Sequence, residues 1–296
     1  MRLFRHVALI VPVLSAASLW GSPVAINAPV ANLNWRPLRL AGGNQLDYYI
    51  DHQTGKPESD LVGDSGSNPG VCIWFDNNGS GSRTDGTLTF RIRLGSDRPQ
   101  PGEFNSELFI GIDANFNAMV DDNALDLFVG ADQRGNPSRL GIWDPGAGLN
   151  ISPRTTSISG PVQTYAQTAG NYDFASATSL GSSVSDLNGD GDPDYFLSFA
   201  IPFADIVARL AARGLTVDDR TPLSYVIVTS NEDNAFNQDL GGVDGGIGSS
   251  TTWRDLGAVT LPASPDQVPE PWSFLLAGGG LLVLALRGAR RPPNVT

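Results

Sequence analysis

The residues best suited to chemistry are oxygen-bearing side chains at every second position of one short segment. They are Asp186, Asn188, Asp190, Asp192 and Asp194, with Gly191 in the sixth position of the same segment. Calcium takes about six to eight oxygen ligands, and a glycine at this point permits the sharp turn that gathers them. Carboxylates this close repel one another without a cation. The spacing favours a calcium loop over the alternative, a solvated turn built on Asp and Asn side chains.

This loop resembles the EF-hand-like loops of extracellular proteins, but it departs from the EF-hand at its end. The twelfth position holds Leu197 where an EF-hand has a bidentate Glu. Pro193 favours an extended backbone at Asp192, so we expect the loop to lead into a strand. The bidentate ligand must then be Asp194 or a residue from elsewhere in the fold.

A second segment repeats this pattern more weakly. Its oxygen-bearing residues are Asp113, Asn115, Asn117 and Asp121. Ala118 stands where glycine is expected, and a left-handed backbone at a residue other than glycine costs about 1 kcal/mol. Metal binding and an ordinary hairpin loop are equally good interpretations here. A third polar cluster is either an outer ligand set, a sugar-contacting loop or a plain loop; it comprises Asn231, Asn234, Asn237 and Asp239.

The sequence contains few residues of the types that catalytic sites use. His6 and His52 are the only histidines, which leaves little material for a Ser-His-Asp triad or a histidine-rich zinc site. Cys72 is the only cysteine, and its apolar neighbours indicate a buried thiol. Of the 31 acids 26 are Asp, and no pair stands in an apolar context that would set up glycoside hydrolysis. A net charge of −12 without a basic face argues against nucleic-acid binding.

The elements that position these residues are short strands separated by Gly-, Asn- and Asp-rich turns, which predicts an antiparallel β-sandwich over residues 30–263. Leu88, Phe90, Ile92 and Leu94 alternate with polar residues and should face the core. The other expected strands are Leu46–Ile50, Val71–Phe75, Leu108–Ile112, Leu125–Gly130, Leu140–Trp143, Tyr195–Ile201, Leu223–Val228 and Ala258–Leu261.

One helix is expected after Pro202, because the apolar residues Phe203, Ile206, Val207 and Leu210 have helical spacing and Gly214 follows as a stop. The order strand, Ile-Pro, helix, strand over residues 185–230 is similar to carbohydrate-binding family 9 and DOMON-like sandwiches. This resemblance implies a sandwich and nothing about activity.

The two ends have the character of targeting segments. Residues 1–25 combine Arg2 and Arg5 with a short apolar run and small residues, as a signal peptide does. In residues 264–296, Pro269, Glu270 and Pro271 precede an apolar run. The arginines Arg287, Arg290 and Arg291 follow that run. This tail resembles the PEP-CTERM signal that exosortase reads in Gram-negative bacteria. The resemblance implies transient insertion in the inner membrane, cleavage near the motif, and delivery to the cell surface or exopolysaccharide matrix. The alternative is a plain membrane anchor, for which the apolar run is short.

These features predict an exported, non-enzymatic surface or matrix protein, stabilised by Ca²⁺ and associated with extracellular polysaccharide. The alternatives are a carbohydrate-binding module and, less favoured, a secreted hydrolase that uses Asp or Glu. Among the tryptophans, Trp74 and Trp143 are expected in the core, and Trp253 is the best candidate for stacking on a sugar at the surface.

Overall fold

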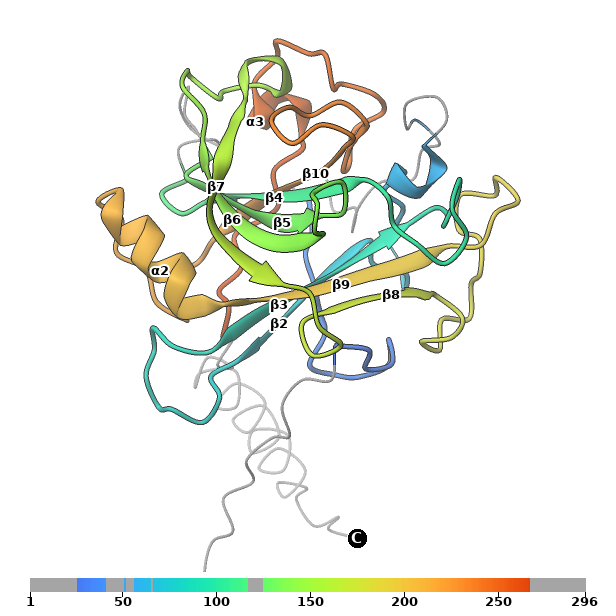
Figure 1. Ribbon diagram of the computed structural model, residues 1–296, viewed down its shortest axis with the longest axis horizontal. Helices are drawn as coiled ribbons and strands as arrows, with labels where there is room; N and C mark the ends of the chain where they lie inside the picture. Colours follow the sequence, from blue (N-terminus) through green and yellow to red (C-terminus); the bar gives the residue numbers. More distant parts are fainter. Residues whose placement is uncertain (1–25, 41–50, 52–55, 65, 117–124, 267–296) are drawn as a thin grey trace, which may run out of the picture.

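The computed structural model describes residues 26–40, 51, 56–64, 66–116 and 125–266, which form two antiparallel sheets packed face to face (Figure 1). The predicted signal peptide lies outside the described residues, as does the predicted sorting tail apart from residues 264–266. His52, Asn117, Asp121 and the predicted strand Leu46–Ile50 lie outside them as well. The predicted fold class, a mostly β sandwich with one short helix, is confirmed.

The first sheet has five strands in the order β1-β2-β3-β9-β8, and the second has six in the order β11-β10-β4-β5-β6-β7. The strands of the first sheet are β1 (Arg36–Pro37), β2 (Val71–Asp76), β3 (Thr87–Leu94), β8 (Tyr172–Ser176) and β9 (Tyr195–Pro202). Those of the second are β4 (Glu107–Asp113), β5 (Leu127–Asp132), β6 (Arg139–Pro145), β7 (Ile158–Ala166), β10 (Ser224–Ser230) and β11 (Asp239–Leu240).

The core lies between the sheets and takes one face of each strand. All four alternating apolar residues of β3 are fully buried in it, as predicted. Phe90 stacks on Phe199 of β9, and it meets Tyr225 of β10 edge-on at a ring-centroid distance of 5.8 Å. Each buried side chain of this size contributes about 1.5–3 kcal/mol relative to exposure. The central strands therefore hold the two sheets together.

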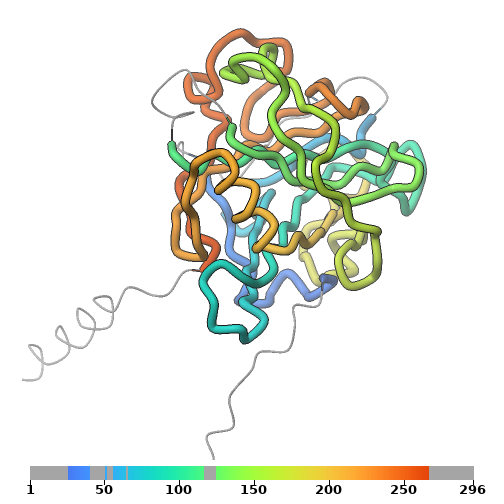
Figure 2. The backbone as a smooth tube through the Cα atoms, turned by 60° about the vertical axis from the view of Figure 1, so that its left-hand side comes forward, coloured from blue at the N-terminus to red at the C-terminus, as the bar shows by residue number. Residues whose placement is uncertain are grey.

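The other face of β3 is buried as well, because the N-terminal segment from Ile26 packs over it. Arg91 is only 2% exposed, and its guanidinium donates to the carbonyl oxygens of Ile26 and Ala28. The same guanidinium lies 4.1 Å above the ring of Trp35. Arg36 donates to the carbonyl oxygen of Ser264 at 2.8 Å, so both ends of the described chain lie on the same side of the sandwich (Figure 2).

The predicted helix is α2 (Phe203–Ala212), which follows β9 directly. Pro202 is its N-cap residue, and Phe203, Ile206 and Leu210 are buried against the sandwich. Gly214 follows with a φ of +84°, a left-handed conformation that suits glycine after a helix. The other helical segments in the described part of the chain are short: η1 (Pro57–Ser59), η2 (Pro153–Thr155) and α3 (Trp253–Leu256). Among the described residues, no helix has the length and apolar character needed to cross a membrane.

Candidate metal centre

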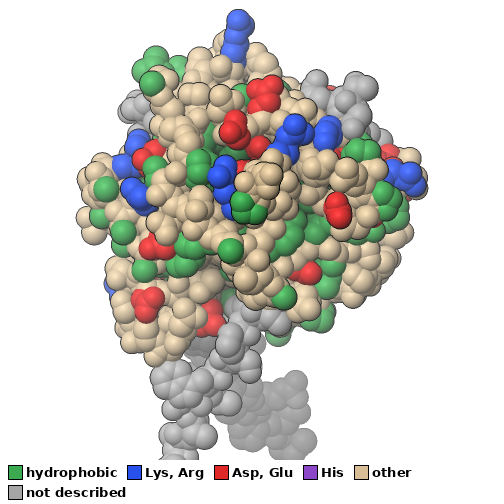
Figure 3. Space-filling view, in the orientation of Figure 1, with side chains coloured by type: hydrophobic (Ala, Val, Ile, Leu, Met, Phe, Trp, Pro, Cys, Tyr) green, Lys and Arg blue, Asp and Glu red, His purple; other side chains and the backbone are tan. Residues whose placement is uncertain are grey.

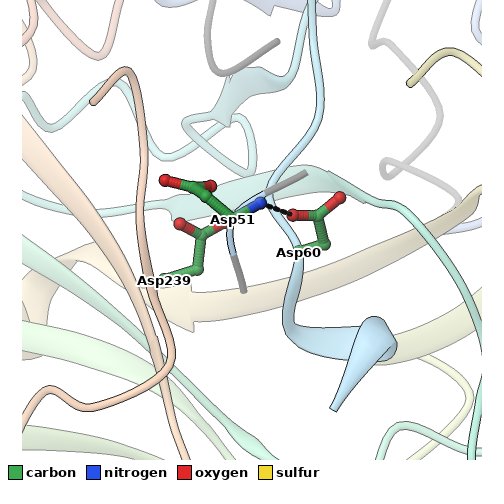
Figure 4. Close-up of side chains that lie close together, drawn as sticks. All are labelled: Asp51, Asp60 and Asp239. Atoms are coloured by element: carbon green, nitrogen blue, oxygen red, sulfur yellow. Dashed lines mark hydrogen bonds between the residues drawn. The ribbon is translucent and has the colours of Figure 1, made fainter. Parts of the chain in front are cut away.

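Asp51 and Asp60, nine residues apart in the chain, meet Asp239 of the edge strand β11 (Figure 4). One carboxylate oxygen from each of Asp51, Asp60 and Asp239 lies within 4.8 Å of the others. Asp60 is fully buried and Asp239 is 1% exposed, whereas Asp51 is partly exposed. Burial of several carboxylates together is costly unless a cation or a proton neutralises them.

The backbone around these residues ties the two sheets together. Asp60 directly follows η1, and the next residue, Leu61, bridges to Leu94 at the end of β3. Asp239 begins β11 at the edge of the second sheet, where it pairs with Thr229 of β10. The hydroxyl of Thr229 donates to the carbonyl oxygen of Ser59 at 2.6 Å. The segment from Ser59 to Leu61 thus lies between both sheets and sets the position of Asp60.

Backbone N–H groups orient the carboxylates. Asp239 accepts a hydrogen bond from the Leu61 N–H on Oδ2 and one from the Leu240 N–H on Oδ1, each at 2.6 Å. Oδ1 of Asp60 accepts from the N–H of Asp51 at 3.3 Å. The Gly245 N–H donates to Oδ2 of Asp51. Oδ1 of Asp51 is buried and has no hydrogen-bond partner in the described structure, which leaves one ligand oxygen available.

The pKa of Asp51 reflects the crowding of acids around it. Burial raises the pKa of Asp51, and the nearby charges of Asp60 and Asp244 raise it further, against the lowering effect of the Gly245 N–H and of Asp239. Carboxylate oxygens at this spacing are the ligands preferred by Ca²⁺, which tolerates irregular geometry better than Mg²⁺ does. The arrangement can therefore hold a divalent ion through three carboxylates.

The predicted calcium loop has the turns that its glycines suggested. Gly189 and Gly191 have φ angles of +76° and +95°, and both donate N–H bonds to the carboxylate of Asp186. Asp190 accepts from the N–H of Asp192 at 2.8 Å. As expected from Pro193, the loop leads into a strand, β9.

Asp194 and Asp192 are each held by an arginine. Asp194 is fully buried, and its Oδ2 accepts from Nε of Arg93 at 2.6 Å and from the N–H of Leu187 at 3.0 Å. Its Oδ1 is buried without a hydrogen-bond partner among the described residues. Arg98 pairs with Asp192 at 2.9 Å. Asp194 therefore has one oxygen occupied by Arg93 and one oxygen left for a ligand.

The loop and the three-carboxylate group are in contact. Nδ2 of Asn188 donates to Oδ2 of Asp60 at 2.5 Å. Burial raises the pKa of Asp190, and the charges of Asp186, Asp192 and Asp60 contribute to the same direction. The loop therefore contacts the three-carboxylate group through Asn188 and Asp60. Metal binding by the loop itself stays a prediction.

The second predicted loop is described only in part. Asp113 is fully buried at the end of β4 and accepts from the N–H of Asn115. Asp126, which the sequence did not single out, accepts from the Ala114 N–H at 2.8 Å and from the Asn115 amide at 3.4 Å. Burial raises the pKa of Asp126. Metal binding by this loop stays a prediction, since Asn117 and Asp121 lie outside the described residues.

The third polar cluster of the sequence is divided by the fold. Asp239 joins the three-carboxylate group, whereas Asn231 and Asn234 line a separate cavity of about 340 Å³. Glu107 also lines this cavity. Sequence reasoning missed Asp51, Asp60 and Glu107. No local spacing marks them, because their neighbours come from distant segments.

Two of the three tryptophan positions predicted from the sequence agree with the structure, and one does not. Trp74 and Trp143 are buried, as predicted, but Trp253 is also buried, so its assignment to the surface was wrong. Nε1 of Trp253 donates to the Asn150 carbonyl oxygen at 3.0 Å, which explains its place inside. A cleft of about 500 Å³ is lined instead by Phe104, Tyr172 and Phe174, together with polar residues.

Acidic and basic side chains are interspersed on the face shown in Figure 3.

Comparisons with known proteins found no match: no family model, no curated protein and no solved structure is similar to this chain.

Proposed function

We propose that this chain is an exported, non-enzymatic bacterial surface or matrix protein whose sandwich is stabilised by calcium. The observation that carries the proposal is the close approach of the carboxylates of Asp51, Asp60 and Asp239, where the two sheets are tied together. An ion at this point would neutralise carboxylates from both layers and so link them. Export rests on the predicted signal peptide and on the exosortase-type sorting tail, with transient insertion in the inner membrane before release.

Calcium should raise the thermal stability of the protein clearly. A ligand at about 100 times its Kd stabilises the folded state by about 2.7 kcal/mol, or about 5–10 °C in Tm for a domain of this size. We expect EDTA to remove this gain, measured by differential scanning calorimetry. An unchanged Tm would contradict the proposal.

Asp51→Asn gives the sharper form of this experiment. Its amide keeps an acceptor for Gly245 and places a donor beside the Asp239 carboxylate, so the variant should melt higher than wild type in EDTA and show no gain with calcium. Asp233→Asn removes an exposed carboxylate instead and serves as the matched control. Loss of charge alone would shift both variants alike.

A carbohydrate-binding function is the second candidate, and the cleft beside β8 favours it. The half-buried rings of Tyr172 and Phe174 supply aromatic surface. Glu103, Asn105 and Asp173 supply polar groups for sugar hydroxyls. Glycan-array screening should give saturable binding that Tyr172→Ala weakens at least tenfold. Leu149→Ala, at an exposed side chain, is the control. Absence of any saturable hit would leave a purely structural role.

A further inference from the structure

An outer cavity of about 440 Å³ lies on the face of the first sheet that is turned away from the core. Four side chains of the neighbouring strands β2, β3 and β9 form its floor: Cys72, Arg91, Arg93 and Phe196. The N-terminal segment at residues 30–37 forms one wall, and the loops at 66–69 and 181–183 form the others. Sites for small molecules measure about 300–1,000 Å³, so the outer cavity is large enough for such a ligand.

The charged residues that line the outer cavity are all basic. Arg91 and Arg93 line it, and none of its described lining residues is acidic. This contrasts with the chain as a whole, which has 31 acidic residues against 19 Lys and Arg. It also contrasts with the cleft beside β8, which Glu103 and Asp173 line. The outer cavity is therefore suited to an anion, whereas the cleft would repel one.

Arg91 is the cation of this cavity whose charge has no acidic partner. Arg93 pairs with the carboxylate of Asp194. Arg91 donates instead to the hydroxyl of Ser198 and to two backbone carbonyl oxygens, and no carboxylate among the described residues pairs with it. Burial lowers the pKa of Arg91 to about 10, against smaller opposing effects of Cys72 and Asp173. A carboxylate in the cavity would offset the cost of burying this charge.

Trp35 offers a second donor beside Arg91. Trp35 lines the outer cavity and is 7% exposed, and its Nε1 has no hydrogen-bond partner within the described structure. The guanidinium of Arg91 lies 4.1 Å from the centroid of the Trp35 ring, so the two donors are neighbours. Ser67 and Ser183 add exposed hydroxyls, and Val30 adds an apolar side chain. These groups match a ligand that combines a carboxylate, hydroxyls and an apolar ring face.

We propose that the outer cavity binds a carboxylate-bearing sugar, the uronic-acid residue of an acidic polysaccharide. Arg91 holds the carboxylate through charge-assisted hydrogen bonds, and the Trp35 N–H binds an oxygen of the same ligand. The serine hydroxyls pair with sugar hydroxyls. The outer cavity shares no lining residue with the candidate metal centre or with the cleft beside β8, so this inference goes beyond the proposed function.

Methyl glucuronide and methyl glucoside form a matched pair of probes, because one carries a carboxylate where the other carries a hydroxymethyl group. Each is titrated into the calcium-loaded, ¹⁵N-labelled full chain, and the indole N–H signal of Trp35 is followed by NMR. This signal is identified by its absence in Trp35→Phe. Methyl glucuronide should shift it saturably, and methyl glucoside should bind at least tenfold more weakly. Equal affinity for the two probes, or no shift with either, would overturn the inference.

Two variants locate the binding. Arg91→Gln should weaken the binding of methyl glucuronide at least tenfold, measured by saturation-transfer NMR. Because Arg91 also holds the N-terminal segment, Trp35→Phe serves as the second variant. It keeps an aromatic ring under Arg91 and removes the N–H, so affinity should fall about fivefold with an unchanged circular dichroism spectrum. Tyr172→Ala, in the cleft beside β8, is the matched control and should bind as wild type does.

The remaining outcomes separate the sugar from other anions. Acetate, or a short peptide with a free C-terminal carboxylate, bound as tightly as methyl glucuronide would contradict a sugar site. Wild-type affinity in both Arg91→Gln and Trp35→Phe would place the ligand elsewhere. Each of these results can occur while calcium still raises the Tm, so failure of this inference is distinguishable from failure of the proposed function.

Discussion

At the scale of single residues, buried acids are placed with different partners and so have different roles. Asp194 is fixed by Arg93, and Asp132 is fixed by Arg139 at 2.8 Å. Glu107 is 1% exposed, and its Oε2 has no hydrogen-bond partner among the described residues. Burial raises the pKa of Glu107 to about 8, and the charges of Asp132 and Asp233 contribute, against Arg134 and Arg139. Glu107 is thus protonated in the folded protein at neutral pH.

This raised pKa predicts a pH-dependent loss of stability. An unfolded glutamate releases its proton near pH 4.5, whereas folded Glu107 keeps it until about pH 8. The free energy of unfolding therefore falls progressively as pH rises through this window. Above the window, the contribution of Glu107 to that free energy is lost completely. Glu107→Gln imitates the protonated form, so its advantage over wild type should grow from pH 5 to pH 8 by on the order of 3 kcal/mol.

Urea unfolding at pH 5, 6.5 and 8 in saturating calcium measures this difference. Keeping calcium saturating cancels the pH dependence of the metal site in both proteins. Glu103→Gln, at an exposed acid, should show no trend with pH. A constant difference between Glu107→Gln and wild type would show that Glu107 is ionised in the folded state.

At the scale of elements, periodicity predicted the strands that are central and apolar. The alternation in β3 and the helical spacing in α2 appear in the structure almost as the sequence placed them. The strands β7 and β8 were missed, because both lie at sheet edges and have no fully apolar face. In β7, Gly160 and Pro161 also hide the strand. Residues 258–261 were wrongly predicted as a strand and form only the isolated bridge between Leu40 and Thr260.

The same contrast holds for the candidate site. The loop from Asp186 to Asp194 is visible in the sequence, since its oxygens are separated by only one residue each. The group of Asp51, Asp60 and Asp239 is invisible there. Asp51 and Asp60 are nine residues apart, and Asp239 lies far along the chain, 178 residues from Leu61, the neighbour of Asp60. Local spacing reveals ligands that one turn brings together. Ligands brought together by sheet packing require the fold.

At the scale of the whole molecule, 26 aspartates and a net charge of −12 set the central problem. Such a chain loses stability through self-repulsion unless cations or arginines compensate. Arginine does so at several points, as at Arg83, which pairs with Asp218 at 2.8 Å and with Asp219 at 3.0 Å. Calcium would do so where both sheets are tied together. A chain with one cysteine has no internal disulfide to serve instead.

The most direct measurement is a crystal structure of the protein grown in calcium, with anomalous scattering recorded at a wavelength where calcium contributes. We expect an anomalous peak about 2.3–2.6 Å from oxygens of Asp51, Asp60 and Asp239. Crystals in saturating calcium that show these three carboxylates in direct contact, with no ion among them, would contradict it.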